Sequence, residues 1–221
     1  MKKFTIIVAG GSGSRMKSII PKQFIPINGI PLMAYTINQF QKVGCEIILV
    51  LPEDHHLTFK ESVLSFCHST EMILVTGGET RFHSVQNGLN AIQEEGVIAI
   101  HDAVRPFIST DLIEENFNSA SEYGNAIVSV PLKDSIRKSI DHKNEARNRS
   151  DYRIIQTPQT FRSEQLFSAY KQSYSNLFTD DASVVEAAGY AIHLMDGDYK
   201  NIKVTTPEDL LIAKAFLNET I

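Results

Sequence analysis

A short apolar run leads directly into a glycine-rich loop in residues 4–16, which read FTIIVAGGSGSRM. The five residues Phe4–Val8 are rich in β-branched and aromatic side chains, and such a run is typical of a buried strand. Gly10, Gly11 and Gly13 carry no Cβ, so their backbone N–H groups can approach and wrap a polyphosphate. The segment therefore predicts either a phosphate-binding loop or a plain tight turn from a strand into a helix.

Two standard phosphate-binding loops can be excluded by spacing. The chain contains no G-x-x-x-x-G-K-[ST] string. The dinucleotide fingerprint G-x-G-x-x-G fails because Met16 stands where its third glycine belongs, and Glu53 lies too far beyond the loop to reach a ribose. What remains is a pair of cations, Arg15 and Lys22, on either side of a loop that Pro21 ends. Such cations can stabilise the extra negative charge of a phosphoryl or nucleotidyl transfer.

The apolar pattern alternates along the first 130 residues. Short runs typical of strands occur at Phe4–Val8, Glu46–Leu51, Met72–Thr76, Val97–Ile100 and Ala126–Val130. Amphipathic stretches typical of helices lie between them, at Pro31–Lys42, Leu57–Cys67, Phe82–Glu95 and Asp111–Tyr123. This alternation predicts an α/β, Rossmann-like fold with a mostly parallel central sheet and helices on both faces.

The last third of the chain continues the pattern after an interruption. We expect helices over Ser163–Tyr174 and Asp180–Ala188, a strand over Ala191–Met195, and a final helix that begins at Thr206 and runs through Leu217. The start of the final helix has a hydroxyl N-cap, a proline at the first helical position and acids in the first turn. No repeat or low-complexity linker divides the chain, so residues 1–221 are expected to form a single domain.

The interruption, residues 133–153, is polar and locally basic. It holds seven basic residues against four acidic ones. The alternation in Ser135–Ile140 predicts one strand of a projecting hairpin, whereas a solvated loop is the plainer alternative. Because long excursions from a compact domain are usually functional, we interpret the segment as a projecting arm.

Composition limits the class of protein. The chain has 221 residues, 43% apolar and 21% charged, with a formal net charge of −5, which fits a globular protein with a real core. The acidic balance argues against a nucleic-acid partner but does not exclude small phosphates. No apolar run approaches membrane-spanning length, and the short run after Lys3 does not resemble a signal peptide. Cys45 and Cys67 form no metal or redox motif, so we expect a cytoplasmic protein without a membrane partner.

Six motifs together resemble one family. They are GGSGSRM (10–16) with PKQF (21–24), GGETRFHSV (77–85), HDAVRPF (101–107), TPQ (157–159), TDDAS (179–183) and NIKVT (201–205). In this order they resemble the 2-C-methyl-D-erythritol 4-phosphate cytidylyltransferase family, one of the pyrophosphorylase-like nucleotidyltransferases, from about residue 4 to residue 217. The resemblance implies an enzyme that transfers CMP from CTP to methylerythritol phosphate and releases pyrophosphate, with Mg²⁺, in non-mevalonate isoprenoid synthesis.

The resemblance also assigns site residues. It implies that CTP is bound by Ala9, Gly10, Gly11, Gly13, Gly78, Glu79, Ser84 and Ala103. It implies catalytic cations at Arg15, Lys22, Arg149 and Lys203, and acceptor contacts at Asp102, Arg105, Ser135 and Thr179. Asp102 follows a predicted strand, at the sheet edge where α/β proteins bind ligands, and is expected near Mg²⁺ held mainly by phosphates and water. The family further implies a homodimer in which arms are exchanged, so that Arg149 acts in the neighbouring subunit's site.

Plainer roles remain open for three of these residues. Ser84 could simply cap a helix, Arg105 could form a salt bridge with Asp102, and Lys203 could lie on a solvated strand face. Two other functions also remain open. One is a ribitol-5-phosphate cytidylyltransferase, against which Ala103 and the sequence after Thr179 argue. The other is a non-catalytic nucleotide sensor, which would not need the set of cations.

Overall fold

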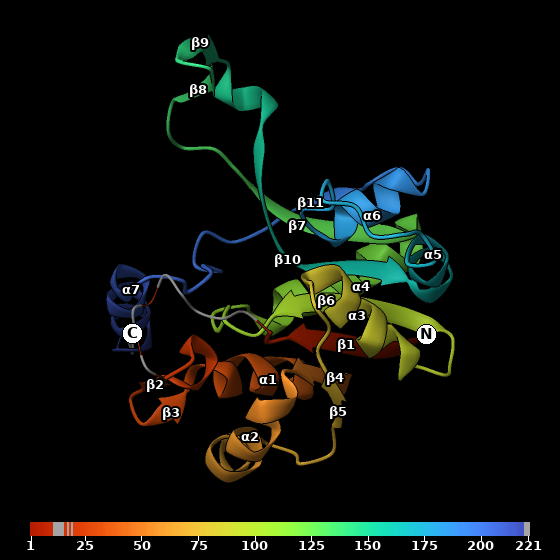
Figure 1. Ribbon diagram of the computed structural model, residues 1–221, viewed down its shortest axis with the longest axis vertical. Coiled ribbons are helices and arrows are strands. Elements are labelled where there is room, and N and C mark those ends of the chain that lie inside the picture. The colour runs from red at the N-terminus through yellow and green to blue at the C-terminus, as the bar shows by residue number, and fades with distance from the viewer. Residues whose placement is uncertain (11–15, 17, 19, 219–221) are drawn as a thin grey trace.

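A seven-stranded sheet forms the centre of the computed structural model, which describes residues 1–10, 16, 18 and 20–218 (Figure 1). The strand order is β11-β7-β10-β6-β1-β4-β5. The strands are β1 (Lys2–Val8), β4 (Glu46–Leu51), β5 (Ile73–Thr76), β6 (Gly96–Asp102), β7 (Asn125–Pro131), β10 (Arg153–Arg162) and β11 (Leu194–Asp196). Only β10 runs antiparallel to its neighbours, β6 and β7, among the pairings described. The predicted α/β fold with a mostly parallel sheet is confirmed.

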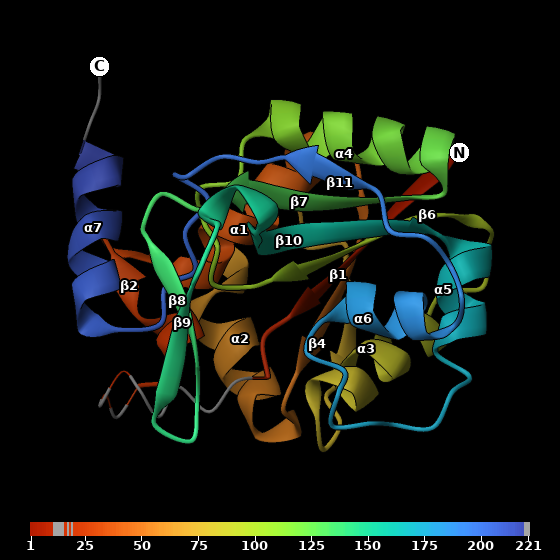
Figure 2. The ribbon, with the colours of Figure 1, turned by 90° about the horizontal axis from the view of Figure 1, so that it is seen from above.

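Alternate side chains of the central strands supply two separate cores. Ile7 faces a cluster that includes residues of α1 (Leu32–Lys42), α2 (His56–Ser62) and α4 (Thr110–Tyr123). Ile6 faces the opposite cluster, with residues of α3 (Arg81–Asn90), α5 (Ser163–Ala169) and α6 (Asp181–Ala187). Figure 2 shows α4 on one side of the sheet and α3, α5 and α6 on the other. Apolar side chains at every position thus identify strands that are buried on both faces.

A third, smaller cluster joins the start of the chain to its end. Ile27 and Leu32 pack with Val104, Val204 and Ala213. They come from β2 (Pro26–Ile27), α1, two loops and α7 (Pro207–Asn218), and β2 pairs with β3 (Ile30–Pro31). The cluster therefore brings the loops around Val104 and Val204 together. No helix over the described residues combines the length and apolar character needed to cross a membrane.

Several predicted helix and strand boundaries are wrong. The helix expected over Leu57–Cys67 stops at Ser62, because the C-cap residue Val63, whose φ of −119° is far from the regular helical value, is fully buried in the core. Only the short 3₁₀ turn η4 (Leu64–Phe66) follows. The helix expected over Ser163–Tyr174 ends at Ala169, and the one over Phe82–Glu95 is α3, ending at Asn90. The strand expected over Ala191–Met195 is the shorter β11, which begins three residues later and ends one residue later.

Strand β10 was not predicted from the sequence. Its central part is polar, yet Gln156, Thr157, Gln159 and Thr160 are all at most 5% exposed. Their side chains are hydrogen-bonded inside the protein; for example, Gln159 Nε2 donates to Asp180 Oδ2 at 2.9 Å. A buried strand of this kind lacks the apolar signal on which strand prediction depends, because internal hydrogen bonds replace the usual apolar packing.

The predicted projecting hairpin is confirmed. Strands β8 (Ile136–Ile140) and β9 (Lys143–Arg147) pair antiparallel around a two-residue turn at Asp141 and His142. Both turn residues have positive φ, 47° and 65°, as a tight hairpin with the favoured twist requires. The hairpin stands away from the body in Figure 1, and the 3₁₀ turn η5 (Arg149–Asp151) leads from it into β10. Two further short 3₁₀ turns within the described part of the chain are η2 (Lys22–Phe24) and η3 (Glu53–His55).

Candidate active site

The carboxyl ends of three parallel strands meet at one level. In the sheet register Val8 of β1 lies opposite Asp102 of β6 and Val50 of β4. Each ladder continues one step into the following loop: Ala9 N donates to Val50 O at 2.9 Å and Ala103 N to Val8 O at 3.1 Å. Gly77 N likewise donates to Leu51 O at 2.8 Å. The loops that begin at Ala9, Gly77 and Ala103 therefore leave the sheet side by side, in the crevice where α/β folds bind ligands.

A cavity of about 220 Å³ opens between these loops. Most of the described residues that the sequence assigned to the nucleotide line it, together with two of the assigned cations and the carboxylate: Ala9, Gly10, Gly78, Glu79, Ser84, Lys22, Lys203 and Asp102. Gly11, Gly13 and Arg15 lie outside the described residues. The first cavity is thus formed by motifs that the sequence places far apart.

Ser84 positions the loop at Gly78. Its Oγ accepts a hydrogen bond from Gly78 N at 3.1 Å, and its side chain is buried. Thr80, not Ser84, is the N-cap of α3, since the Thr80 side chain accepts from His83 N. A Cβ on Gly78 would lie 2.5 Å from His83 Cβ, so only glycine fits this turn. The plain helix-cap role considered for Ser84 therefore belongs to Thr80.

Lys22 is presented to the same cavity by a short rigid turn. Phe24 N donates to Pro21 O at 2.9 Å, which closes the 3₁₀ turn η2. Gln23 is 1% exposed and its Nε2 donates to Ala9 O at 3.0 Å. This buried amide ties the Lys22 turn to the first residue of the glycine-rich loop, so both nucleotide motifs form one wall.

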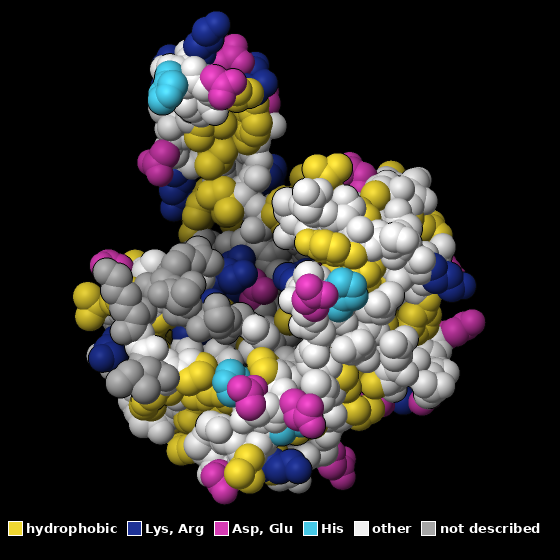
Figure 3. All heavy atoms as spheres, in the orientation of Figure 1, with side chains coloured by type: hydrophobic (Ala, Val, Ile, Leu, Met, Phe, Trp, Pro, Cys, Tyr) yellow, Lys and Arg dark blue, Asp and Glu magenta, His cyan; other side chains and the backbone are white. Residues whose placement is uncertain are grey.

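A second cavity, of about 320 Å³, shares Arg81, Asp102 and Lys203 with the first. Its other lining residues include Arg105 and Thr179, both of which the sequence assigned to the acceptor. Figure 3 shows basic and acidic side chains next to one another in the hollow at the base of the projecting hairpin. The arrangement offers two adjoining compartments with a shared set of charges, which suits two substrates that react with each other.

Asp102 lies at the centre of the shared charges. Its Oδ2 is 3.0 Å from Lys203 Nζ and 3.2 Å from Arg105 Nε, and its backbone N donates to Thr157 Oγ1 at 3.1 Å. Burial raises the pKa of this carboxyl, but Lys203, Arg81 and Arg105 outweigh burial and hold the pKa well below its ordinary value. Asp102 is therefore an anion at neutral pH, and the salt bridge considered for Arg105 is present.

Lys203 reaches Asp102 from a segment that is not a strand. The β-like segment expected around it is wrong, since residues 201–205 form no regular element. Instead, Val204 is fully buried and its N donates to Val104 O at 2.9 Å, while Asn201 Nδ2 donates to Thr157 O at 2.8 Å. Anchors on both sides of Lys203 hold its side chain over Asp102.

Three further assigned residues lie apart from the lining of both cavities. Ser135 and Arg149 belong to the exposed arm, where Arg149 Nη1 donates to Lys133 O. Ala103 is 1% exposed, and its carbonyl accepts from Thr36 Oγ1 at 2.9 Å. Thr179, by contrast, lines the second cavity, and its N donates to Ser183 Oγ at 3.1 Å.

Arg81 is a site residue that the sequence reasoning did not single out. It lines both cavities, and its guanidinium pairs with Asp181 at 2.6 Å and 2.5 Å. Its position within the motif GGETRFHSV was the available signal. Thr157 and Asn201 were missed in the same way, although both lie in quoted motifs.

The fit of a divalent cation can be judged from the carboxylates. No group of three His, Cys, Asp or Glu side chains among the described residues could hold a metal by itself. Glu79 lines the first cavity, Asp180 lines the second, and Asp102 lines both. Mg²⁺ usually binds one or two carboxylates and takes its other ligands from substrate phosphates and water. The residues present fit a Mg²⁺ ion that arrives with a triphosphate.

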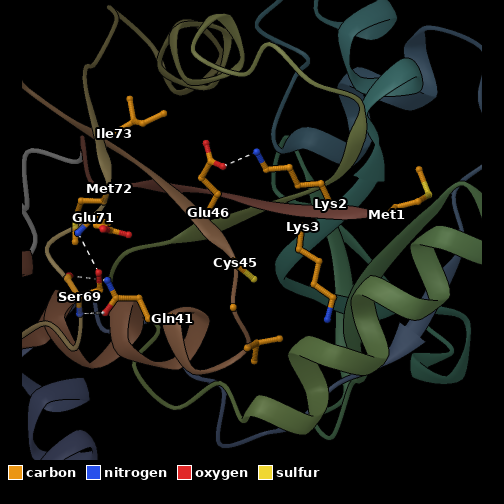
Figure 4. Close-up of a pocket in the computed structure, with 12 residues that line it drawn as sticks. Met1, Lys2, Lys3, Gln41, Cys45, Glu46, Ser69, Glu71, Met72 and Ile73 are labelled. Carbon is orange, nitrogen blue, oxygen red and sulfur yellow. Dashed lines mark hydrogen bonds and ion pairs between the residues drawn. The ribbon is translucent and has the colours of Figure 1, made fainter.

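A larger cavity, of about 800 Å³, lies at the opposite edge of the sheet (Figure 4). Its lining includes Lys2, Glu46 and Ile73, the first residues of β1, β4 and β5. Lys2 Nζ is paired there with Glu46 at 2.9 Å. None of the described residues that the sequence assigned to substrates lines this cavity, so size alone does not identify the active site.

Comparisons with known proteins identify the family. The family model for 2-C-methyl-D-erythritol 4-phosphate cytidylyltransferase (IspD) matches residues 4–219. The enzyme of that name from Bacteroides thetaiotaomicron is 43% identical over 219 residues, covering 98% of this chain and 100% of the relative. The one from Porphyromonas gingivalis is 43% identical over 217 residues, covering 98% of each chain.

Solved structures agree with the sequence relatives. The 4-diphosphocytidyl-2C-methyl-D-erythritol synthase of Anaerococcus prevotii superposes with a TM-score of 0.82 at 30% identity, covering 97% of this chain and 98% of that chain. The cytidylyltransferase of Thermus thermophilus gives a TM-score of 0.80 at 27% identity and covers 98% of each chain. This chain belongs to the 2-C-methyl-D-erythritol 4-phosphate cytidylyltransferase family.

Proposed function

We propose that this chain transfers CMP from CTP to 2-C-methyl-D-erythritol 4-phosphate and releases pyrophosphate, as a step of isoprenoid precursor synthesis. Family membership over residues 4–219 supports the reaction class. The observation that carries the proposal is the pair of adjoining cavities that share Arg81, Asp102 and Lys203. A transfer between two phosphorylated substrates needs two such compartments with cations at their junction.

In this proposal the first cavity binds CTP. Ala9, Gly10, Gly78, Glu79 and Ser84 line it. In the proposal, Gly78, Glu79 and Ser84 bind the cytosine side of the nucleotide. Gly11 and Gly13 complete the glycine-rich loop after β1, and Ala103 contributes through its backbone. Lys22, with Arg15, stabilises the charge that develops on the α-phosphate oxygens and on the departing pyrophosphate.

The second cavity binds the acceptor. The ionised Asp102 carboxylate can accept hydrogen bonds from substrate hydroxyls, while Arg105 and Lys203 hold that carboxylate and supply positive charge beside it. Thr179 lines the same cavity and contributes a hydroxyl. The attacking oxygen belongs to an alkyl phosphate, which is already ionised near neutral pH. No general base is required, and catalysis consists of positioning and charge stabilisation.

In this proposal Mg²⁺ binds together with the triphosphate of CTP. Asp102, which lines both cavities, is the candidate protein ligand, although two cations already contact Oδ2 of that carboxylate. When bound, the ion neutralises charge on the phosphate oxygens. The protein residues then have to orient the acceptor phosphate toward the α-phosphorus.

The arm is proposed to act across a homodimer. Residues 133–153 would leave the single nucleotidyltransferase domain of one subunit and bring Ser135 and Arg149 to the acceptor cavity of the other. Exposed apolar side chains on and below the hairpin support this interface, among them Ile140 (56% exposed), Tyr152 (41%) and Ile154 (46%). A cytoplasmic location belongs to the same proposal, and the free thiols Cys45 and Cys67 fit a reducing compartment.

One assay tests the proposed reaction. Purified protein is incubated with Mg²⁺, each nucleoside triphosphate in turn, and either methylerythritol phosphate or ribitol 5-phosphate, and pyrophosphate release is measured. We expect release with CTP and methylerythritol phosphate. Faster release with ribitol 5-phosphate would reassign the acceptor. CTP binding without any release in either arm would instead make the chain a nucleotide sensor.

A further inference from the structure

The two walls of the active site are joined by an ion pair between residues 100 positions apart. Arg81 is the first residue of α3 and directly follows the nucleotide loop Gly77–Thr80. Asp181 is the first residue of α6 and directly follows Thr179 and Asp180, which line the second cavity. The pair therefore connects the segment that faces the nucleotide to the segment that faces the acceptor.

The geometry of this pair is fixed on several sides. Both guanidinium nitrogens engage the carboxylate, Nη1 to Oδ1 at 2.6 Å and Nη2 to Oδ2 at 2.5 Å. Tyr170 Oη donates to Asp181 Oδ1 at 2.7 Å, and Asp181 is fully buried. A buried charge is tolerated only with such complete pairing, and a two-pronged Arg–carboxylate contact fixes orientation as well as distance. Arg81 thus has little freedom to move relative to Asp181.

Arg81 also faces the substrates, whereas Asp181 does not. The Arg81 side chain is 31% exposed and lines both cavities, while Asp181 has no exposed surface. The guanidinium adds positive charge near Asp102, because it is one of the groups that lower the pKa of that carboxyl. Arg81 is consequently placed at the junction of the two compartments, with its orientation set from behind by Asp181.

The segment that faces the acceptor, Thr179 and Asp180 before α6, is called the acceptor turn here, and it has a second set of supports. Its position can therefore change without its unfolding. Phe82 stacks on Phe178 and on Tyr170, with ring centroids 5.7 Å and 4.8 Å apart. Gln159 accepts from Ala182 N at 2.8 Å, and Asp180 caps α6 through Ser183 N. Because these contacts remain when the ion pair is weakened, the turn can stay folded while its distance from the nucleotide loop changes.

We propose that Arg81 is a positioning residue for the transfer reaction, acting through Asp181 to hold the acceptor turn at a set distance from the nucleotide loop. This inference rests on the proposed function. The nucleotide loop keeps its own supports, namely the Thr80 cap and the bond from Gly78 N to Ser84 Oγ. Weakening the ion pair therefore moves the acceptor side and leaves the CTP side in place.

The test is a kinetic comparison of Arg81→Lys, Asp181→Asn and the double variant. Arg81→Lys keeps the positive charge but loses the two-pronged contact, and a displacement of about 1 Å lowers kcat/KM about 100-fold. We expect each single variant to lower kcat and to raise KM for the acceptor. The Kd for CTP alone, from calorimetry without acceptor, should stay within about threefold, since an unperturbed loop binds the nucleotide equally well. The double variant should have a kcat/KM no lower than that of the less active single variant, because both changes remove the same contact.

Matched variants separate positioning from loss of stability. Tyr170→Phe removes one hydrogen bond to Asp181 but keeps both guanidinium contacts and the ring stack, so it should lower Tm without changing KM for the acceptor. Arg162→Lys changes an arginine that binds Ser121 O, away from both cavities, and should change neither quantity. Assays are run at a temperature well below the Tm of every variant. If Asp181→Asn does not fold, the comparison of Arg81→Lys with Arg162→Lys decides.

Two results would overturn the inference. Variants of Arg81 with a lower Tm but unchanged kcat and KM would show a purely structural ion pair. A loss of CTP affinity as large as the rise in acceptor KM would make Arg81 a nucleotide-binding residue instead. Failure of the proposed function gives a different outcome, because the unaltered chain would then release no pyrophosphate from CTP and methylerythritol phosphate.

Discussion

Lys203 Nζ lies 3.0 Å from Oδ2 of Asp102, at the junction of the two cavities that form the proposed active site. Arg105 Nε approaches the same oxygen to 3.2 Å. One carboxylate thus holds two cations from different parts of the chain, the loop after β6 and the segment after β11. Removing the carboxylate would release both cations at once, which makes Asp102 the most informative single position to change.

Asp102→Asn should lower kcat/KM by about 100-fold, because an amide cannot hold Lys203 and Arg105 as an anion does and misplaced charge is costly in a transfer reaction. Pyrophosphate release under steady-state conditions measures the effect. Asp111→Asn, at an exposed position in the first turn of α4, is the matched control and should keep full activity. A variant at Asp102 that worked as well as its control would mean that the two cations do not need the carboxylate.

Lys22→Ala should cut kcat by about 100- to 1000-fold, since removing one stabiliser of developing charge has that effect in comparable sites. The Kd for CTP should change less than tenfold, because charge that develops only in the transition state contributes little to ground-state binding. Rapid-quench turnover and calorimetric CTP titration measure the two quantities separately. Lys60→Ala on α2 provides an exposed control. Equal losses in both quantities would assign Lys22 to CTP binding alone.

His101 predicts a pH dependence of stability. Burial lowers the pKa of His101 to about 3, against an opposing effect of Asp102. In the unfolded chain the pKa of a histidine is about 6.5. The unfolded state therefore binds the proton first, so this contribution to stability is complete above about pH 6.5 and falls as pH drops toward the folded pKa.

Urea unfolding of the unaltered chain and of His101→Gln tests this sign. Between pH 6.5 and pH 5 the unaltered chain should lose about 2 kcal/mol more free energy of unfolding than His101→Gln, because glutamine does not titrate. Subtracting one curve from the other removes the pH dependence contributed by the carboxylates, because both chains contain the same ones. Parallel curves over this range would show that His101 can be protonated without unfolding.

Mixed subunits test the arm. Arg149→Ala protein and Lys22→Ala protein are each expected to be nearly inactive alone. After subunit exchange, half of the dimers combine one intact body with one intact arm, so about a quarter of the unaltered activity should return if arms cross the interface. Exchange is verified with two differently tagged chains. Verified exchange without recovered activity would place Arg149 in the site of its own subunit.

The sequence was sufficient to predict those strands of the sheet whose buried side chains are apolar. Strand β6, with Val97, Ile98 and Ile100, was recognisable because both of its faces contact a core. Strand β10 was not, since Gln159 and Thr160 are buried through hydrogen bonds that a single sequence does not reveal. The end of α2 at Ser62 was also missed, because the burial of Val63 in the core is a tertiary contact that a single sequence does not reveal.

Those parts of the candidate site that follow the ends of predicted strands could be predicted from the sequence. Loops that follow parallel strands meet at one edge, and this brought Ala9, Gly78 and Asp102 together as expected. The partner of Arg81 was not predictable, because Asp181 lies 100 positions away and looks like an ordinary helix-start acid. Pairing between distant charges requires knowledge of which helix starts face one another.

Because Val8 is aligned with Asp102 and Val50 in the sheet, the position of each loop of the site depends on the exact number of residues in its strand. Deleting one residue within β1 or β6 would withdraw its loop by about 3.3 Å and turn the following side chains to the opposite face. An in-frame deletion in the turn at residues 91–95, on the far edge, leaves that spacing intact. In a library of single-codon deletions, deletions within β1 or β6 should therefore abolish activity, even at strand positions where substitutions are tolerated. Deletions in the turn at the other end of the strands should leave activity intact.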